Sequence, residues 1–204
     1  MNRSFSVFFI LFYWSTLALG QNEAKALVEN YQKLGPDEAV RSILIDKQNY
    51  KWLGTDKGLY RMISMDHEPE FIVQDSIMGL AEDKKEILWY GNRQQQLQTE
   101  DGSQNIILGN AKPQISSMAY YKGDLWVGTD QGLFRVSDDQ SKILNHYTVS
   151  NSKLQSNQIN SLYADQDERL WVGTDAGIAK IHKKDWDYYE KQHRFTGAIA
   201  TSEG

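Results

Sequence analysis

The sequence predicts an all-β fold, a β-propeller of four-stranded antiparallel blades, on three observations. Tryptophan recurs at Trp52, Trp89, Trp126 and Trp171, a period of 37 to 45 residues. Apolar residues around each tryptophan alternate with a period of two, which is typical of strands and not of helices. Short polar turns separate these segments. We expect about four blades and the start of a fifth, in an incomplete ring.

Each of these tryptophans is followed by any residue and then glycine, in WLGT, WYGN and two copies of WVGT. The absent side chain at this glycine permits close packing between neighbouring sheets. The glycines concerned are Gly54, Gly91, Gly128 and Gly173.

Three copies continue as Thr-Asp-x-Gly, which indicates a hairpin turn. We expect Gly58, Gly132 and Gly177 to take the left-handed conformation that a three-residue hairpin turn requires. The second and third strands then flank this turn, and residues 145–149 of the third copy are expected to form a fourth strand.

Two further positions repeat upstream of the tryptophans. A branched aliphatic residue stands eleven or twelve positions before each, at Val40, Ile77, Ile115 and Ile159. An aspartate stands six positions before three of them, at Asp46, Asp83 and Asp165, in the expected first turn of the blade. The third copy departs here and has one turn residue fewer.

These repeats divide the expected chain into seven segments. They are a signal peptide (1–20), an N-terminal strand that would close the last blade (21–39), blade 1 (40–76), a degenerate blade 2 (77–114), blade 3 (115–158), blade 4 (159–194) and the start of blade 5 (195–204).

The N-terminal residues predict export. Arg3 precedes an apolar run from Val7 to Trp14, and Ala18 and Gly20 suit a signal-peptidase site, so we expect cleavage after Gly20 and a periplasmic protein. A membrane anchor is the alternative, but the run is shorter than the roughly 20 apolar residues that a span needs. The remaining sequence has no second such run and no cysteine.

The last ten residues align with the first strand and turn of the third copy, which indicates a fifth blade. The alternative is a closed four-bladed ring, in which residues 195–204 would have another role.

The string LWVGTDQGLFRV at 125–136, together with I-x-S-L-x-x-D upstream of the fourth tryptophan, resembles the two-component regulator propeller repeat. The resemblance extends over about residues 27–204. It implies a periplasmic seven-bladed propeller that precedes a linker, a membrane span and a histidine kinase, and that senses glycans. It also implies that the missing C-terminal blades and an output domain belong to the same parent chain.

Composition and motifs exclude several chemistries. The net charge is −5, which argues against a nucleic-acid partner. The four histidines lack zinc-ligand spacing, so we expect no metal and no cofactor. The pair Asp165 and Asp167 is interpreted as turn residues and not as acid–base catalysts. Trp186 is interpreted as a half-buried residue of an outer strand.

The candidate ligand site is the face where the turns between second and third strands meet the links between blades. It comprises Asp56, Arg93, Gln94, Gln95, Asp130 and Asp175. In the second copy Arg93, Gln94 and Gln95 replace the usual Asp-x-Gly; this is either drift in one blade or recruitment of planar polar groups for a polyhydroxyl ligand.

We therefore expect a non-enzymatic sensor fragment that binds an oligosaccharide or another small polar ligand. A secreted propeller lyase and a non-signalling binding scaffold are the alternatives.

Overall fold

The computed structural model describes residues 38–64, 67–109, 111–137, 142–183 and 185–190. These residues form sixteen strands in four antiparallel sheets, each made from four consecutive strands. The signal peptide, the segment 27–33 of the N-terminal strand, and the start of the fifth blade lie outside the described residues.

Blade 1 contains β1 to β4, and blade 2 contains β5 to β8. Their strands are β1 (Val40–Ile45), β2 (Lys51–Thr55), β3 (Leu59–Met62), β4 (Glu70–Val73), β5 (Ile77–Glu82), β6 (Leu88–Asn92), β7 (Gln96–Thr99) and β8 (Asn105–Ile107).

Blade 3 contains β9 to β12, and blade 4 contains β13 to β16. Their strands are β9 (Ile115–Tyr121), β10 (Asp124–Thr129), β11 (Gly132–Val136), β12 (Ile143–Tyr147), β13 (Ile159–Ala164), β14 (Arg169–Thr174), β15 (Gly177–His182) and β16 (Asp185–Glu190). The all-β meander predicted from the repeats is thus confirmed.

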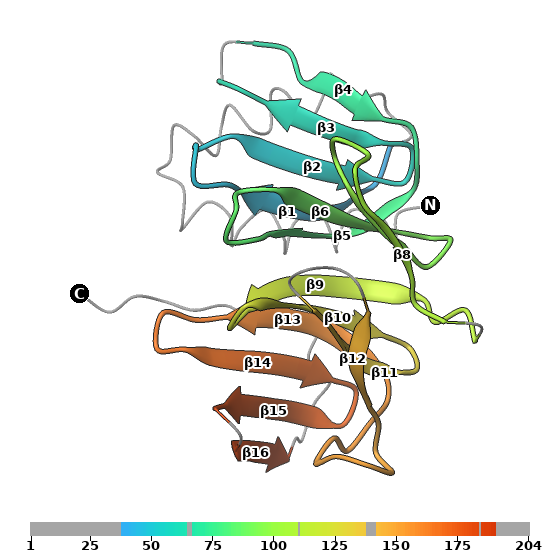
Figure 1. Cartoon of the computed structure of the whole chain (residues 1–204), viewed down its shortest axis with the longest axis vertical. Coiled ribbons are helices and arrows are strands. Elements are labelled where there is room, and N and C mark those ends of the chain that lie inside the picture. Colours follow the sequence, from blue (N-terminus) through green and yellow to red (C-terminus); the bar gives the residue numbers. More distant parts are fainter. Residues whose placement is uncertain (1–37, 65–66, 110, 138–141, 184, 191–204) are drawn as a thin grey trace, which may run out of the picture.

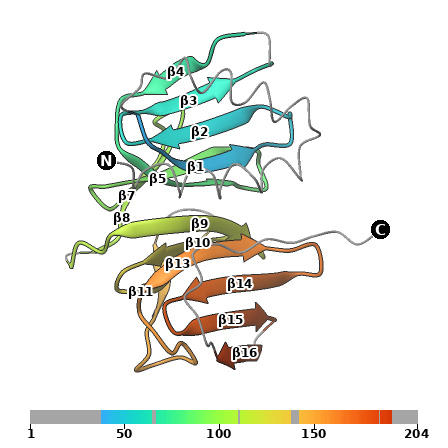
Figure 2. The same cartoon turned by 180° about the vertical axis from the view of Figure 1, so that it is seen from behind.

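The blades stack through their first strands. β1 packs beside β5, β5 beside β9, and β9 beside β13, while no comparable packing joins β13 to β1 among the described residues. Blades 1 and 2 form the upper half of the view in Figure 1 and blades 3 and 4 the lower half, and Figure 2 shows the same order from behind. The four described blades therefore form an open arc and not a closed four-bladed ring.

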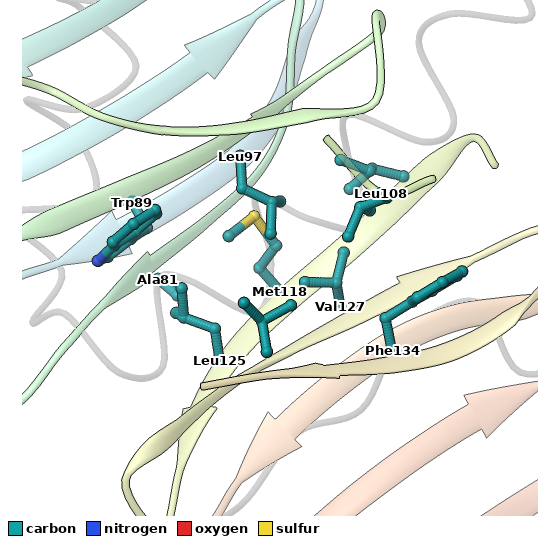
Figure 3. Close-up of a cluster of buried hydrophobic side chains, with 10 residues drawn as sticks. Ala81, Trp89, Leu97, Leu108, Met118, Leu125, Val127 and Phe134 are labelled. Carbon is teal, nitrogen blue, oxygen red and sulfur yellow. The ribbon is translucent and has the colours of Figure 1, made fainter. Parts of the chain in front are cut away.

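One apolar core lies at each blade interface. Between blades 2 and 3, Trp89 of β6 packs with Met118, Leu125 and Val127 of blade 3 (Figure 3). Trp52 packs with Ile77 and Leu80 of blade 2 in the same way. Trp126 belongs to the core between blades 3 and 4, with Ile159 and Val172. The repeated tryptophans of blades 1 to 3 thus lie in the interface with the following blade.

In blades 1 to 3 the glycine after the tryptophan lies directly against the following blade, in accordance with the close packing expected from the sequence. A Cβ at Gly54 would stand 2.6 Å from Cγ2 of Ile77, and a Cβ at Gly128 would stand 2.5 Å from Cγ2 of Ile159. A Cβ at Gly91 would similarly meet Ile115 at 2.9 Å. The repeated branched aliphatic residue of one blade therefore fills the space over the repeated glycine of the blade before it.

The predicted left-handed conformation was wrong for Gly58, which does not have a positive φ. Gly132 (φ 124°) and Gly177 (φ 154°) do have a positive φ, which favours glycine, although these angles are larger than those of the left-handed helical region. The threonine that begins the turn closes it instead. Thr55 Oγ1 accepts the N–H of Gly58 at 2.8 Å and donates to the Gly58 carbonyl at 2.9 Å.

Glycine is needed at these positions because the fourth strand passes directly over them. A Cβ at Gly58 would lie 2.5 Å from Phe71 Cε2 and 2.8 Å from the Val73 carbonyl oxygen. Gly132 and Gly177 are covered in the same way by the carbonyls of Tyr147 and Tyr189. These glycines therefore make room for a neighbouring strand.

The fourth strand of blade 3 also differs from its prediction, since it covers Ile143–Tyr147 and not 145–149. Thr148 begins a turn whose carbonyl accepts the N–H groups of Asn151 and Ser152 at 3.2 and 3.0 Å. The backbone bonds of this turn end the strand two residues earlier than the sequence pattern indicates.

Candidate functional site

The turns between second and third strands lie beside the start of the first strand of the same blade. The N–H of Asp56 donates to the Ala39 carbonyl, that of Asp130 to Gln114, and that of Asp175 to Gln158, at 3.1 to 3.3 Å. Arg93 makes the same contact with Ser76 in blade 2 at 3.1 Å. In every blade the predicted turn and the link from the preceding segment therefore share one edge.

The three predicted aspartates hold this edge together. One carboxylate oxygen of Asp56 accepts the N–H of Ala39 at 2.9 Å, and one of Asp130 accepts that of Gln114 at 2.7 Å. Asp175 instead accepts the side-chain amide of Asn160 at 2.9 Å. Each carboxylate thus fastens the entry of its own blade, and any ligand role would be added to this structural one.

Blade 2 builds the turn differently. Gln95 is buried, has a φ of 64°, and donates its side-chain amide to the Arg93 carbonyl. Asn92, in the place of threonine, accepts the N–H of Gln96 at 2.9 Å and donates to Asp75 at 2.7 Å. Gln95 therefore closes the turn, whereas Arg93 and Gln94 are exposed at its tip.

A repeated irregularity adds residues to this edge that sequence reasoning missed. The pairing of the first and second strands skips one residue near the start of every first strand. The skipped residues are Arg41, Met78, Ser116 and Asn160. Such bulges redirect a side chain and strengthen the local twist. The sequence carries no signal for them, because the four residues share no chemical type.

The aspartate six residues before three of the repeated tryptophans has a role beyond its turn. Asp46 and Asp165 accept the indole N–H of Trp52 and Trp171 at 2.7 Å, and Asp83 accepts that of Trp89 at 3.2 Å. The constant six-residue spacing is the signal that would have revealed these pairs. In blade 3 the shorter turn has no such aspartate, and Trp126 donates to the Tyr121 carbonyl at 3.3 Å.

Asp165 is the most heavily bonded of these carboxylates. Burial alone would raise its pKa, but hydrogen bonds from Trp171 and Arg169 outweigh that effect and hold the pKa of Asp165 below its ordinary value. Arg169 donates to it at 2.6 Å, and the carboxyl side chain is only 6% exposed. Asp165 is thus a structural anion, in accordance with its interpretation as a turn residue.

No group of three or more His, Asp or Glu side chains in the described ranges could hold a metal ion. No helix in the same ranges is long and apolar enough to span a membrane. His146 donates its Nε2–H to the Gln131 carbonyl at 2.8 Å and stacks on Phe134. His67 forms a hydrogen bond with the Ser64 hydroxyl at 2.6 Å.

Comparisons with known proteins point to one repeat type. The family described as "Two component regulator propeller" matches residues 153–176, which contain β13, β14 and the Trp171 motif. No curated protein sequence matches the chain.

Solved structures show the same fold at low identity. The extracellular domain of the hybrid two component system BT3049 from B. thetaiotaomicron superposes with a TM-score of 0.67 at 21% identity, over 83% of this chain and 25% of that chain. The extracellular domain of BT4673 from the same organism superposes with a TM-score of 0.61 at 18% identity, over 76% of this chain and 22% of that chain. Virginiamycin B lyase from Staphylococcus aureus superposes with a TM-score of 0.59 at 14% identity, over 76% of this chain and 59% of that chain.

The chain thus spans about a quarter of the length of these two extracellular domains. It has a β-propeller fold similar to extracellular domains of hybrid two component systems, and residues 153–176 match the two-component regulator propeller repeat.

Proposed function

We propose that this chain is the N-terminal part of the periplasmic input domain of a two-component sensor, and that the complete domain is a seven-bladed propeller that senses a glycan. The observation that carries the proposal is the propeller repeat at 153–176, in a chain whose fold resembles extracellular domains of such systems. The chain itself has no catalytic role in this proposal.

The open arc supports the need for further blades. The repeated tryptophan of blades 1 to 3 is 3%, 0% and 4% exposed, whereas Trp171 of blade 4 is only partly buried. Trp171 would be covered by a following blade, as its three counterparts are. A ligand bound over the central channel would contact turns from several blades, so a complete ring should be required for affinity.

The first test is the coding DNA downstream of codon 204. We expect further Trp-x-Gly-Thr motifs at steps of about 40 residues, then a membrane span and a kinase. A reading frame that ended after a seventh blade with no signalling domain would contradict the sensor proposal.

The second test is binding to an oligosaccharide library by calorimetry, with the complete extracellular region and with this chain. We expect affinity only for the complete region, and in it we expect Arg93→Ala to weaken binding about tenfold. Lys85→Ala is the matched control, because Lys85 is an exposed cation of the same blade at the opposite end of β6. Micromolar binding by residues 21–204 alone would overturn the requirement for a complete ring.

A propeller lyase is the second candidate, and the superposition on virginiamycin B lyase supports it through fold alone. Turnover of a streptogramin or polysaccharide substrate by the complete protein would favour the lyase, whereas ligand-dependent phosphorylation of its kinase would favour the sensor.

A further inference from the structure

A cavity of about 260 Å³ lies between blades 3 and 4. It is reached from the edge that carries the turns β9–β10 and β15–β16, because Lys122 and Lys183 of those turns line it. The predicted ligand turns lie at the other end of the same strands, where Asp130 follows β10 and Asp175 follows β14. This cavity is therefore separate from the candidate site described above and independent of the proposed function.

Aromatic side chains form one wall of the cavity. Trp126 and Tyr147 stack with ring centroids 5.7 Å apart and an angle of 6° between the planes. Trp186 of blade 4 meets Tyr147 at 5.1 Å and 58°. Tyr147 and Trp186 both line the cavity and are only partly buried, so parts of their rings are accessible to a molecule inside it. Aromatic faces of this kind hold flat or ring-shaped ligands.

The charged residues that line the cavity are all cations, although the chain carries a net charge of −5. They are Lys122, Arg135 and Lys183, and no carboxylate lines it. Arg135 is held in place by Asp124 at 2.6 Å and lies over the ring of Trp126 at 5.6 Å. Lys122 pairs at 3.2 Å with Glu168, whose side chain is 70% exposed, so water weakens this pair.

The shorter first turn of blade 3 explains why the cavity lacks a carboxylate. In the other three blades an aspartate of this turn accepts the tryptophan N–H. In blade 3 the Tyr121 carbonyl takes that role, and the Tyr121 hydroxyl reaches across to the Glu168 carbonyl of blade 4 at 2.7 Å. The interface between blades 3 and 4 therefore lacks the aspartate that accepts the tryptophan N–H in the other blades, and its nearby carboxylate, Asp124, is paired with Arg135 at 2.6 Å.

We propose that the cavity binds a small organic anion made of a single ring with a carboxylate or sulfate group. The ring would lie against Tyr147 and Trp186, and the anionic group would face Arg135 and Lys183. The volume suits one ring, since it lies below the range of about 300–1,000 Å³ found for drug-sized ligands. Cations above an aromatic wall match both parts of such a ligand.

Tryptophan fluorescence of the full chain tests this proposal, with glucuronate and benzoate as ring-bearing anions and with glucose and benzyl alcohol as their neutral counterparts. We expect saturable quenching by at least one anion, and about tenfold weaker binding of its neutral counterpart. A preference for glucuronate would assign a sugar acid, and a preference for benzoate an aromatic acid.

Lys183→Glu should weaken binding of the anion about tenfold or more. Lys112→Glu is the matched control, because Lys112 is also an exposed lysine with positive φ but does not line the cavity. Trp186→Leu should remove the binding, with circular dichroism to verify the fold. Absence of saturable quenching by both anions at millimolar concentration would overturn the proposal, and so would equal losses in the two lysine variants.

Discussion

The tryptophan of each blade combines two requirements in one residue. Its ring fills the interface with the next blade, and its N–H must still find an acceptor when buried. Asp46, Asp83 and Asp165 supply that acceptor in three blades, and their other oxygen caps the turn: Asp83 Oδ1, for example, accepts the N–H of Lys85 and of Ile87 at 2.8 and 3.0 Å. Turn and core are therefore fastened by one carboxylate.

Asp165→Asn should destabilise the chain by about 1–3 kcal/mol at neutral pH, because one amide oxygen cannot accept all the bonds that the carboxylate accepts. The folded pKa of Asp165 lies below its ordinary value. The stability that ionised Asp165 contributes is consequently present above the unfolded pKa of about 3.9 and is lost as the pH falls toward the folded pKa. In thermal melts from pH 7 to pH 3, the difference in melting temperature between wild type and Asp165→Asn should therefore become smaller.

Asp167→Asn is the control for this series, since Asp167 occupies the same turn with a side chain that is 71% exposed. Its melting temperature should follow wild type at every pH. If the difference in melting temperature between Asp165→Asn and wild type grew larger in acid, the stabilising role assigned to the Asp165 carboxylate would be contradicted.

At the scale of elements, the contact between blades is an asymmetric pair in which a first-strand isoleucine enters the space over a second-strand glycine. Gly128→Ala would place its Cβ 2.5 Å from Cγ2 of the fully buried Ile159. Overpacking of this kind costs about 1–3 kcal/mol. Gly173→Ala should cost less, because the described atom nearest to its Cβ is the Ser161 hydroxyl, which can rotate.

Urea unfolding of the two variants measures this difference. The double variant Gly128→Ala with Ile159→Leu should recover part of the loss, because leucine carries no methyl group on its Cβ. If Gly128→Ala and Gly173→Ala lowered the free energy of unfolding equally, and Ile159→Leu restored none of the loss, the glycine would be required by its own strand and not by the contact between blades.

The cross-blade bond of Tyr121 is a second element-scale contact. Tyr121→Phe removes the donor to the Glu168 carbonyl and should cost about 0.5–1.5 kcal/mol. Tyr163→Phe, on the first strand of blade 4, gives a matched loss of one hydroxyl at a partly buried position. The melting temperature measured by calorimetry should be lower for Tyr121→Phe than for Tyr163→Phe. The opposite order would contradict a stabilising contribution from the bond between Tyr121 and the Glu168 carbonyl.

At the scale of the whole molecule, the open arc of described blades leaves the repeated tryptophan of blade 4, Trp171, accessible. Trp171 stacks with Tyr189, which is 48% exposed, on the face of blade 4 that points away from blade 3. Trp171→Phe should therefore remove a larger share of acrylamide-quenchable fluorescence than Trp89→Phe. In a protein that contains a following blade, this difference should disappear, whereas its persistence would argue against a blade stacked on blade 4.

The repeat made the architecture predictable, because strand alternation and a tryptophan at a fixed place specify a blade whatever the surrounding sequence. Gly54, Gly91 and Gly128 were also predictable, since a missing side chain at a repeated core position implies close approach. The role of Gly58 was not, because the local turn pattern does not reveal that Phe71 of another strand covers it.

The sequence predicted which edge of the blades carries the candidate site, but not which side chains on that edge face solvent. Topology alone places Asp56, Asp130 and Asp175 beside the entries of their blades. Whether a side chain there faces solvent depends on local bonding, as the contrast between buried Gln95 and exposed Arg93 shows. The cavity beside Trp126 and Trp186 could not be predicted, since it needs side chains from two blades and the loss of one turn residue.

The glycine–isoleucine contact also gives the arc a direction. At each of the three described interfaces, the earlier blade presents its tryptophan and glycine and the later blade presents its branched residue. Truncation therefore uncovers different side chains at the two ends: removing blade 4 would uncover the indole ring of Trp126, whereas removing blade 1 would uncover Ile77, Leu80 and Tyr90 of blade 2. During synthesis the most recently folded blade exposes its tryptophan until the next blade packs on it. The surface that is prone to aggregation therefore shifts to a new blade each time one is added.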